Sequence, residues 1–160
     1  MAKLKLNGLE EYEKQLLHLR DVSHECIGKA VYDGAKEVAD AVRREIRGLP
    51  IDERHVSQGE MLHGITAKQK AGLLDGFGIS KMEDENGYLH VKLGFAGHND
   101  VKTRMYPAGQ PNSVIARSVN SGTSFRAAIP FVDMAVRSTK NAAEQAMKNT
   151  LDKEIGRAIK

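Results

Sequence analysis

The sequence predicts a mixed α+β protein, in which long helices pack on a small antiparallel sheet made by one central hairpin. Three observations indicate this fold class. Apolar residues recur at helical spacing over residues 8–20 and 24–47. Apolar and polar residues alternate on both sides of Asn86-Gly87, as in a hairpin. Another helical pattern follows Pro130 and gives a long C-terminal helix over residues 131–159.

Composition limits the possible classes of protein. The 160 residues fit a single domain over 1–160. The single cysteine, Cys26, excludes an internal disulfide framework and a Cys-rich zinc site. No uncharged run approaches the ~20 apolar residues of a membrane span. Residues 101–160 carry ten basic and four acidic side chains, which could contact phosphates or form a solvated helix face.

Two N-terminal helices are expected within residues 8–47. In the first, over 8–20, apolar residues recur at helical spacing. Ser23 is expected to cap the second, and Gly48 with Pro50 to end it. Small residues beside the apolar face of the second helix would let another element approach closely. These small residues are Ala30, Gly34 and Ala35, and the face itself consists of Ile27, Val31, Val38, Val42 and Ile46.

Two long segments have no secondary-structure period. Residues 48–69 contain three glycines and a proline, and a connection of this length in a compact domain is commonly functional or ordered by a partner. We expect it to be mobile until the protein assembles. Residues 96–112 form the second loop.

The β-hairpin is expected over residues 73–95. A two-residue turn at Asn86-Gly87 would pair Glu85 with Tyr88, but it would place the apolar residues of the two strands on opposite faces. A three-residue turn pairs Asp84 with Tyr88 and brings both apolar sets to one face. We therefore predict the three-residue turn, in which Ile79 opposes Leu93 and Phe77 opposes Phe95.

The last two helices differ in length and pattern. A short helix over 113–120 is expected to be capped by Asn112 or Ser113 and to end at Gly122. In the long helix over 131–159, the apolar stripe before Met147 lies roughly 130° from the stripe after it. Either this helix breaks near Met147, or its second half packs on something other than its first half, such as the first helix or a neighbouring subunit.

The sequence offers little catalytic chemistry. Its six histidines lack the spacing of metal ligands, and no phosphate-binding glycine loop occurs. Cys26 is interpreted as a small buried apolar residue, and His90 as an exposed strand residue. A hydrolase built on Cys26 and a distant histidine is the catalytic alternative. We expect no enzyme activity, no cofactor and no metal.

Four local patterns follow one another along the chain. They are Asn7-Gly8-Leu9-Glu10-Glu11; Gly72-Leu73-Leu74 before Phe77-x-Ile79, with the return strand Val91-Lys92-Leu93-Gly94-Phe95; Ile115-Ala116-Arg117-x-Val119-Asn120-x-Gly122-Thr123; and Ile129-Pro130-Phe131. In this order they resemble the small neck and tail-completion proteins (minor tail, head–tail joining) of lambda-like long-tailed phages and prophages. The family often has an acidic residue where Asn120 stands, and an Arg-Pro where this chain has Val132-Asp133-Met134.

The resemblance implies a structural virion protein that is made in the cytoplasm of the bacterial host and acts at the head–tail junction. Its implied partners are further copies of itself in a ring and other head–tail connector and tail proteins, with DNA passing through the ring as an additional contact. It implies no membrane and no small-molecule substrate. The family-motif turn consists of Gly122, Thr123, Pro130 and Phe131, and the candidate assembly surface of Met147, Leu151, Ile155 and Ile159.

One further class stays open. A small basic nucleic-acid-binding accessory protein of a phage or bacterium would contact phosphates through basic residues of the last third of the chain. The residues expected to do so are Arg126, Arg137, Lys140 and Lys148.

Overall fold

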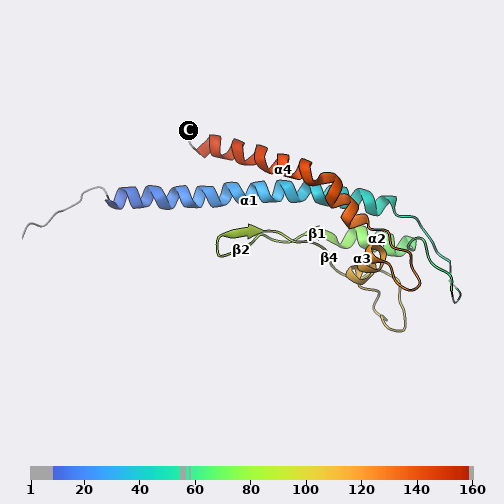
Figure 1. Ribbon diagram of the computed structural model, residues 1–160. Helices are drawn as coiled ribbons and strands as arrows, with labels where there is room; N and C mark the ends of the chain where they lie inside the picture. The colour runs from blue at the N-terminus through green and yellow to red at the C-terminus, as the bar shows by residue number, and fades with distance from the viewer. Residues whose placement is uncertain (1–8, 55–56, 58, 159–160) are drawn as a thin grey trace, which may run out of the picture.

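The computed structural model describes residues 9–54, 57 and 59–158, and it has the predicted mixed α+β fold in which helices dominate (Figure 1). Two antiparallel ribbons of two strands each follow one another along the central hairpin. Within the described part, the helices are α1 (Leu9–Gly48), α2 (Ala67–Gly76), α3 (Asn112–Ser121) and α4 (Phe131–Ala158), and the strands are β1 (Phe77–Ile79), β2 (Glu83–Glu85), β3 (Tyr88–His90) and β4 (Leu93–Phe95).

Helix α1 is one continuous helix of 40 residues, where the sequence predicted two. The expected cap, Ser23, lies inside it, so this prediction was wrong. The flanking residues 20–26 contain neither glycine nor proline, and serine alone disfavours a helix interior only weakly. At 1.5 Å per residue, a helix of this length extends over about 60 Å.

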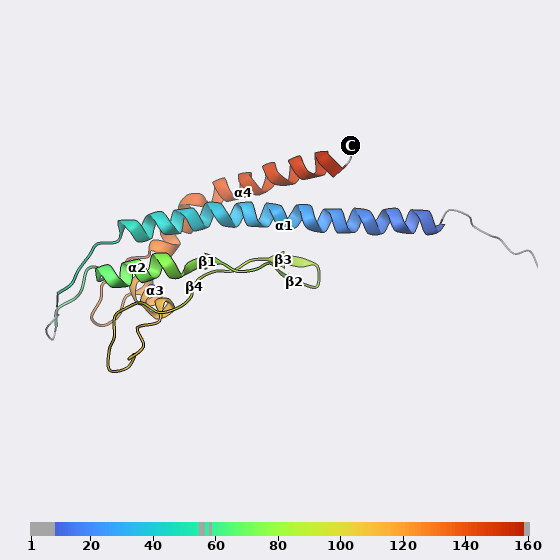
Figure 2. The same ribbon diagram turned by 180° about the vertical axis from the view of Figure 1, so that it is seen from behind.

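Helices α1 and α4 run antiparallel and side by side, and the first turns of α1 extend beyond the end of α4 in both views (Figures 1 and 2). Gly34 makes the close approach possible. A Cβ atom added there would lie 2.4 Å from Cγ of Met147, so only glycine fits without movement of Met147. Ala30 is also buried. The prediction that small residues on α1 admit a neighbouring element is confirmed.

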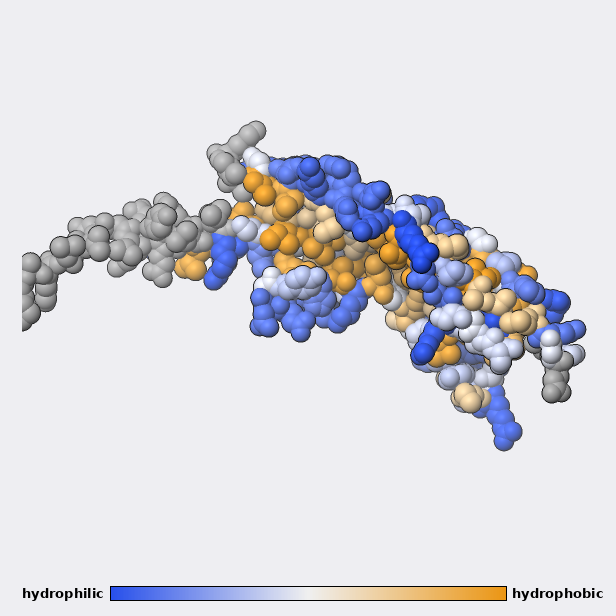
Figure 3. All heavy atoms as spheres, in the orientation of Figure 1, coloured by the Kyte–Doolittle hydropathy of each residue, from blue (hydrophilic) through white to orange (hydrophobic). Residues whose placement is uncertain are grey.

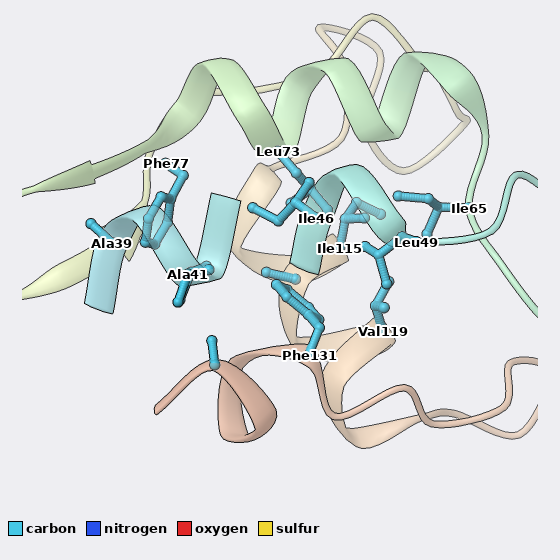
Figure 4. Close-up of a cluster of buried hydrophobic side chains, with 13 residues drawn as sticks. Ala39, Ala41, Ile46, Leu49, Ile65, Leu73, Phe77, Ile115, Val119 and Phe131 are labelled. Atoms are coloured by element: carbon cyan, nitrogen blue, oxygen red, sulfur yellow. The ribbon is translucent and has the colours of Figure 1, made fainter. Parts of the chain in front are cut away.

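The hydrophobic core lies at one end of the molecule, between the last turns of α1, helices α2 and α3 and the first turns of α4 (Figure 4). Phe131 is fully buried at its centre and packs edge-on against Phe95. The core is thus assembled from segments far apart in the sequence. Its members are Ala39, Ala41, Val42, Ile46, Leu49, Ile65, Leu73, Phe77, Ile115, Ala116, Val119, Phe131 and Ala135.

The connection between α1 and α2, which we expected to be mobile until assembly, is anchored to the fold at both ends. Leu49 and Ile65 belong to the core, and Ile51 pairs with Ile65. The carboxylate of Asp52 accepts hydrogen bonds from the backbone of His63 and the side chain of Arg54. Single apolar residues in a loop carry no period, so the pattern did not reveal these anchors.

The hairpin has two registers. Next to the turn, Glu85 pairs with Tyr88, so the predicted three-residue turn was wrong. Asn86 and Gly87 both have positive φ, 57° and 86°, as a two-residue Asn-Gly turn requires. Farther from the turn, Phe77 pairs with Phe95 and Ile79 with Leu93, as predicted.

One extra residue reconciles the two registers. Residues 80–82 of the outgoing strand lie opposite residues 91–92 of the return strand, so the hairpin contains a bulge between its two ribbons. The Ser80 hydroxyl accepts a hydrogen bond from the backbone of Lys92 at this point. The turn therefore adopts its preferred geometry, while the bulge returns the apolar residues to a common face.

The predicted helix over 113–120 is α3, but its cap differs from the prediction. Pro111 occupies the cap position, and the Asn112 side chain instead donates to the carbonyl of Ala96. The helix ends at Gly122, as predicted, with a φ of 74°. The preceding loop is folded back on itself, since the backbone of Gln110 donates to Val101 and that of Asn99 donates to Gln110.

Helix α4 does not break near Met147, which excludes one of the two explanations of its divided apolar stripe. Its first turns pack into the core through Phe131 and Ala135. Its second half lies along α1, as the contact between Met147 and Gly34 shows. The apolar residues shift around the helix axis at Met147 because the two halves of α4 pack against different parts of the structure.

Truncation of Phe131 tests whether the core depends on the start of α4. We expect Phe131→Ala to lower the free energy of unfolding by about 3–5 kcal/mol, because it removes a fully buried ring. Val136→Ala, five residues on and half exposed, is the matched control and should change it by less than about 1 kcal/mol. Urea titration followed by circular dichroism measures both, and equal effects would contradict this account of the core.

Candidate assembly surfaces

Two polar links hold one edge of the contact between the second half of α4 and α1. Lys29 donates to Glu154 at 2.8 Å, and the Thr150 hydroxyl donates to Asp33 at 2.6 Å. The ammonium of Lys29 holds the pKa of Glu154 below its ordinary value, and the carboxylates of Glu154 and Glu25 raise the pKa of Lys29. These links fix how α4 is rotated against α1.

The opposite edge of the same contact carries an apolar strip, consisting of Ile27, Val31, Met147, Leu151 and Ile155. Helix geometry places Ile27 and Val31 on the side of α1 away from Lys29 and Asp33. Ile27 is 44% exposed and Ile155 is 42% exposed, whereas the other three side chains are half-buried. A continuous apolar surface is visible along α1 between α4 and the hairpin (Figure 3).

The structure thus divides the predicted assembly surface. Met147 serves mainly the contact with Gly34, Leu151 is half-buried beside it, and Ile155 faces solvent. Ile159 lies outside the described residues. The sequence pattern did not assign Ile27 to this surface, because it shares a helical face with residues that are buried in the core farther along α1, such as Val42 and Ile46.

The first half of the family-motif turn reverses the chain after α3. Gly122 adopts a positive φ, and Thr123 exchanges backbone hydrogen bonds with Arg126 at 2.9 and 3.3 Å. A side chain at residue 122 would be strained by this backbone conformation and would also crowd Ala128. Gly122 and Thr123 therefore shape the fold.

The second half of the motif starts α4. Pro130 is exposed at the cap position, where no backbone N–H is required, and Phe131 is buried in the core. Asn120 supplies the missing cap from the end of α3. The side-chain oxygen Oδ1 of Asn120 accepts a hydrogen bond from the backbone N–H of Val132 at 3.0 Å. Its side-chain nitrogen Nδ2 donates to the carboxylate of Asp133 at 3.0 Å.

Arg126 is buried, so it cannot contact phosphates as the nucleic-acid alternative expected. Only 4% of this residue is exposed. Its guanidinium donates to Ser118 and Gln69, and burial lowers its pKa. Gln69 also forms a capping box with Thr66 at the start of α2. The pattern Thr66-x-x-Gln69 could have revealed this box in the sequence, whereas no local signal marks Arg126 as buried.

The three other basic residues of that alternative, Arg137, Lys140 and Lys148, are exposed on α4. They are spread over three turns of one helix and are accompanied by the equally exposed Glu144, which lies 4.0 Å from Lys140. This is the arrangement of a solvated helix face.

The described residues contain no group of three or more side chains that could hold a metal ion. His24 pairs with Asp84 at 2.9 Å, His90 is half-buried beside Glu83, where the sequence predicted an exposed residue, and Cys26 is a buried free thiol, as predicted. A hollow between α1 and the hairpin turn is lined by Arg20, Asp21, Ser23, His24, Ile27 and Asp84 among others. It is open to solvent, and its polar lining includes the Ser23 hydroxyl beside the His24–Asp84 pair.

None of the described helices is long and apolar enough to cross a lipid bilayer. No protein-family profile, no curated protein and no solved structure matches this chain.

Loss of the Asn120 cap should weaken the start of α4. We expect Asn120→Ala to lower the free energy of unfolding by about 1 kcal/mol, since the Val132 amide loses its acceptor. Asn141→Ala, at an exposed position within α4, should change it by less than about 0.5 kcal/mol. Chemical denaturation measures both, and an Asn120→Ala protein as stable as the control would contradict the capping role.

Acid should loosen the second half of α4. Because the pKa of Glu154 is lowered in the folded chain, its pairing stabilises the protein above the ordinary glutamate pKa of about 4.3, and this contribution is lost as the pH falls below that value. We expect the protection factors of the amides of residues 147–157, which correct for the intrinsic pH dependence of exchange, to fall on acidification. Glu154→Gln should remove this dependence on acid, whereas Glu144→Gln should retain it. Identical pH profiles for both variants would refute the role of the Glu154 pairing.

Proposed function

We propose that this chain is a structural subunit of the head–tail junction of a long-tailed phage or prophage, which assembles with copies of itself and with other virion proteins to join tail to capsid. The observation that carries the proposal is the apolar strip. Two of its residues, Ile27 and Ile155, stay substantially exposed on helices that are held together by defined contacts.

An exposed apolar strip on a rigid support is characteristic of a surface that another protein covers. The α1–α4 contact fixes the strip before any partner arrives, because Gly34 admits Met147 and two polar links set the rotation of α4. A preformed surface loses less conformational entropy on binding than a mobile one. These features favour an assembly role over catalysis.

The resemblance to neck and tail-completion proteins supports the same proposal through different residues. Its most specific pieces, Gly122-Thr123 and Pro130-Phe131, reverse the chain after α3 and place Phe131 in the core. These residues serve the fold of this chain. The partners of the assembly must then be recognised elsewhere on the surface.

The apolar strip alone would give weak association. Full burial of an isoleucine side chain contributes about 1.5–3 kcal/mol, so covering the exposed parts of Ile27 and Ile155 contributes on the order of 2 kcal/mol in total. This corresponds to roughly thirtyfold in affinity. A stable assembly therefore requires further contacts.

A carboxylate in the strip tests the proposal. We expect Ile155→Asp to reduce self-association in sedimentation experiments and to leave separate heads and tails in a complementation assay, because burying an unpaired charge is unfavourable. Asn141→Asp introduces the same carboxylate on an exposed polar part of α4 and should behave like the wild type.

Deletion of the gene for this chain from its phage or prophage tests the proposed function itself. Electron microscopy should then show unjoined heads and tails. Normally joined virions formed without the protein would contradict the proposed function, whatever the effect of the strip variants.

A further inference from the structure

The two most exposed large apolar side chains of the described residues lie at opposite ends of the hairpin. Tyr88, 72% exposed, follows the hairpin turn, and Met105, 79% exposed, lies in the loop between β4 and α3. The hairpin turn lies alongside α1, where His24 pairs with Asp84, and the loop lies beyond the other end of the hairpin, near α3 (Figures 1 and 2). Neither residue contributes to the core.

The charges around these two side chains have opposite signs. Strand β2, which pairs with Tyr88, consists of Glu83, Asp84 and Glu85. Met105 follows Lys102 and Arg104, which are exposed. Glu83 and Asp84 form ion pairs within the hairpin and with α1. Among the described residues, no ion pair engages Glu85, Lys102 or Arg104.

Hydrogen bonds within each segment order both. Asp84 accepts a hydrogen bond from the backbone of Gly87 at 2.7 Å, and this bond closes the hairpin turn. In the loop, Thr103 and Tyr106 exchange backbone hydrogen bonds at 3.1 Å. Gly109, with a φ of 114°, passes so close to Asn99 that a Cβ atom would collide with its carbonyl oxygen. Docking would therefore order few additional residues.

We propose that the acidic hairpin tip of one copy, Glu83–Glu85 with Tyr88, docks on the basic loop of the next copy, Lys102–Met105. The inference rests on the proposed function, since it names the partner for a self-assembling subunit. Two acidic tips would repel each other, so the contact joins the hairpin tip of one copy to the basic loop of another. Such a head-to-tail contact forms rings when its rotation closes and filaments when it does not.

A charge exchange tests this contact. Glu85→Lys and the pair Lys102→Glu with Arg104→Glu should each weaken self-association about tenfold or more, because each places like charges in contact. The protein that carries all three changes should recover most of the lost affinity, since the introduced lysine then meets the two introduced carboxylates while Glu83 and Asp84 keep their ion pairs within the subunit. Lys36→Glu, on an exposed part of α1, is the control. Analytical ultracentrifugation at low and high salt gives the dissociation constants.

Failure of the combined variant to recover would overturn the proposal, as would wild-type affinity in the separate variants. Circular dichroism establishes that each variant is folded. If the combined variant does not fold, the two single-cysteine proteins described next test the same contact, because they leave the surface charges unchanged.

Single cysteines locate the contact directly. Oxidation of a mixture of Tyr88→Cys and Met105→Cys proteins should give a disulfide-linked dimer, and neither protein alone should give one. The natural Cys26 is buried and stays in place. Dimers from Tyr88→Cys alone would indicate a two-fold contact and overturn the proposal, and so would the absence of mixed dimers in assembled particles.

The same particles separate the two proposals. If the charge variants still associate normally and join heads to tails, the tip-to-loop contact is wrong and the proposed function stands. If joined particles form without any copy of this protein, the proposed function fails.

Discussion

The close approach of α1 and α4 at Gly34 is the constraint on which the rest of the structure depends. Gly34 lets Met147 reach the backbone of α1, so α4 continues along α1 after leaving the core. Without this contact the second half of α4 would have no partner among the described residues. One edge of the α1–α4 contact is polar, because Lys29 bonds to Glu154 and Thr150 bonds to Asp33 there. The other edge is apolar. The exposed strip is therefore a consequence of how the helices pack.

The position of the core leaves the hairpin tip and the first turns of α1 outside it. Phe131, Ile46 and Leu73 gather at one end, and the hairpin and first turns of α1 extend away from it. A hairpin of this kind is only marginally stable alone. Here the bulge lets its base join the core through Phe77 and Phe95 while its tip keeps an Asn-Gly turn. The tip is thus both ordered and exposed, as a docking element requires.

The sequence predicted the fold class, the extent of α4 and the pairing of Phe77 with Phe95, because each depends on a local period or on burial of one strand face. It failed where two local signals competed. The Asn-Gly turn and the apolar alternation demanded different registers, and a bulge satisfied both. Ser23 suggested a cap, but nothing beside it breaks a helix. The buried Arg126 and the capping role of Asn120 arise from tertiary contacts that leave no local pattern. The exposed charges of the hairpin tip and of the loop between β4 and α3 were likewise recognised only once the fold placed the two segments apart.

The central claim is that the apolar strip on α1 and α4 is uncovered in the free subunit and covered in the assembled junction. The rate of thiol labelling at Ile155→Cys tests it most directly, because this side chain is exposed and lies at the end of the strip. We expect rapid labelling in the free protein and strong protection in purified particles, whereas a cysteine in place of the exposed Lys36 on α1 should react in both. Equal labelling of Ile155→Cys in the free and assembled states would contradict the account.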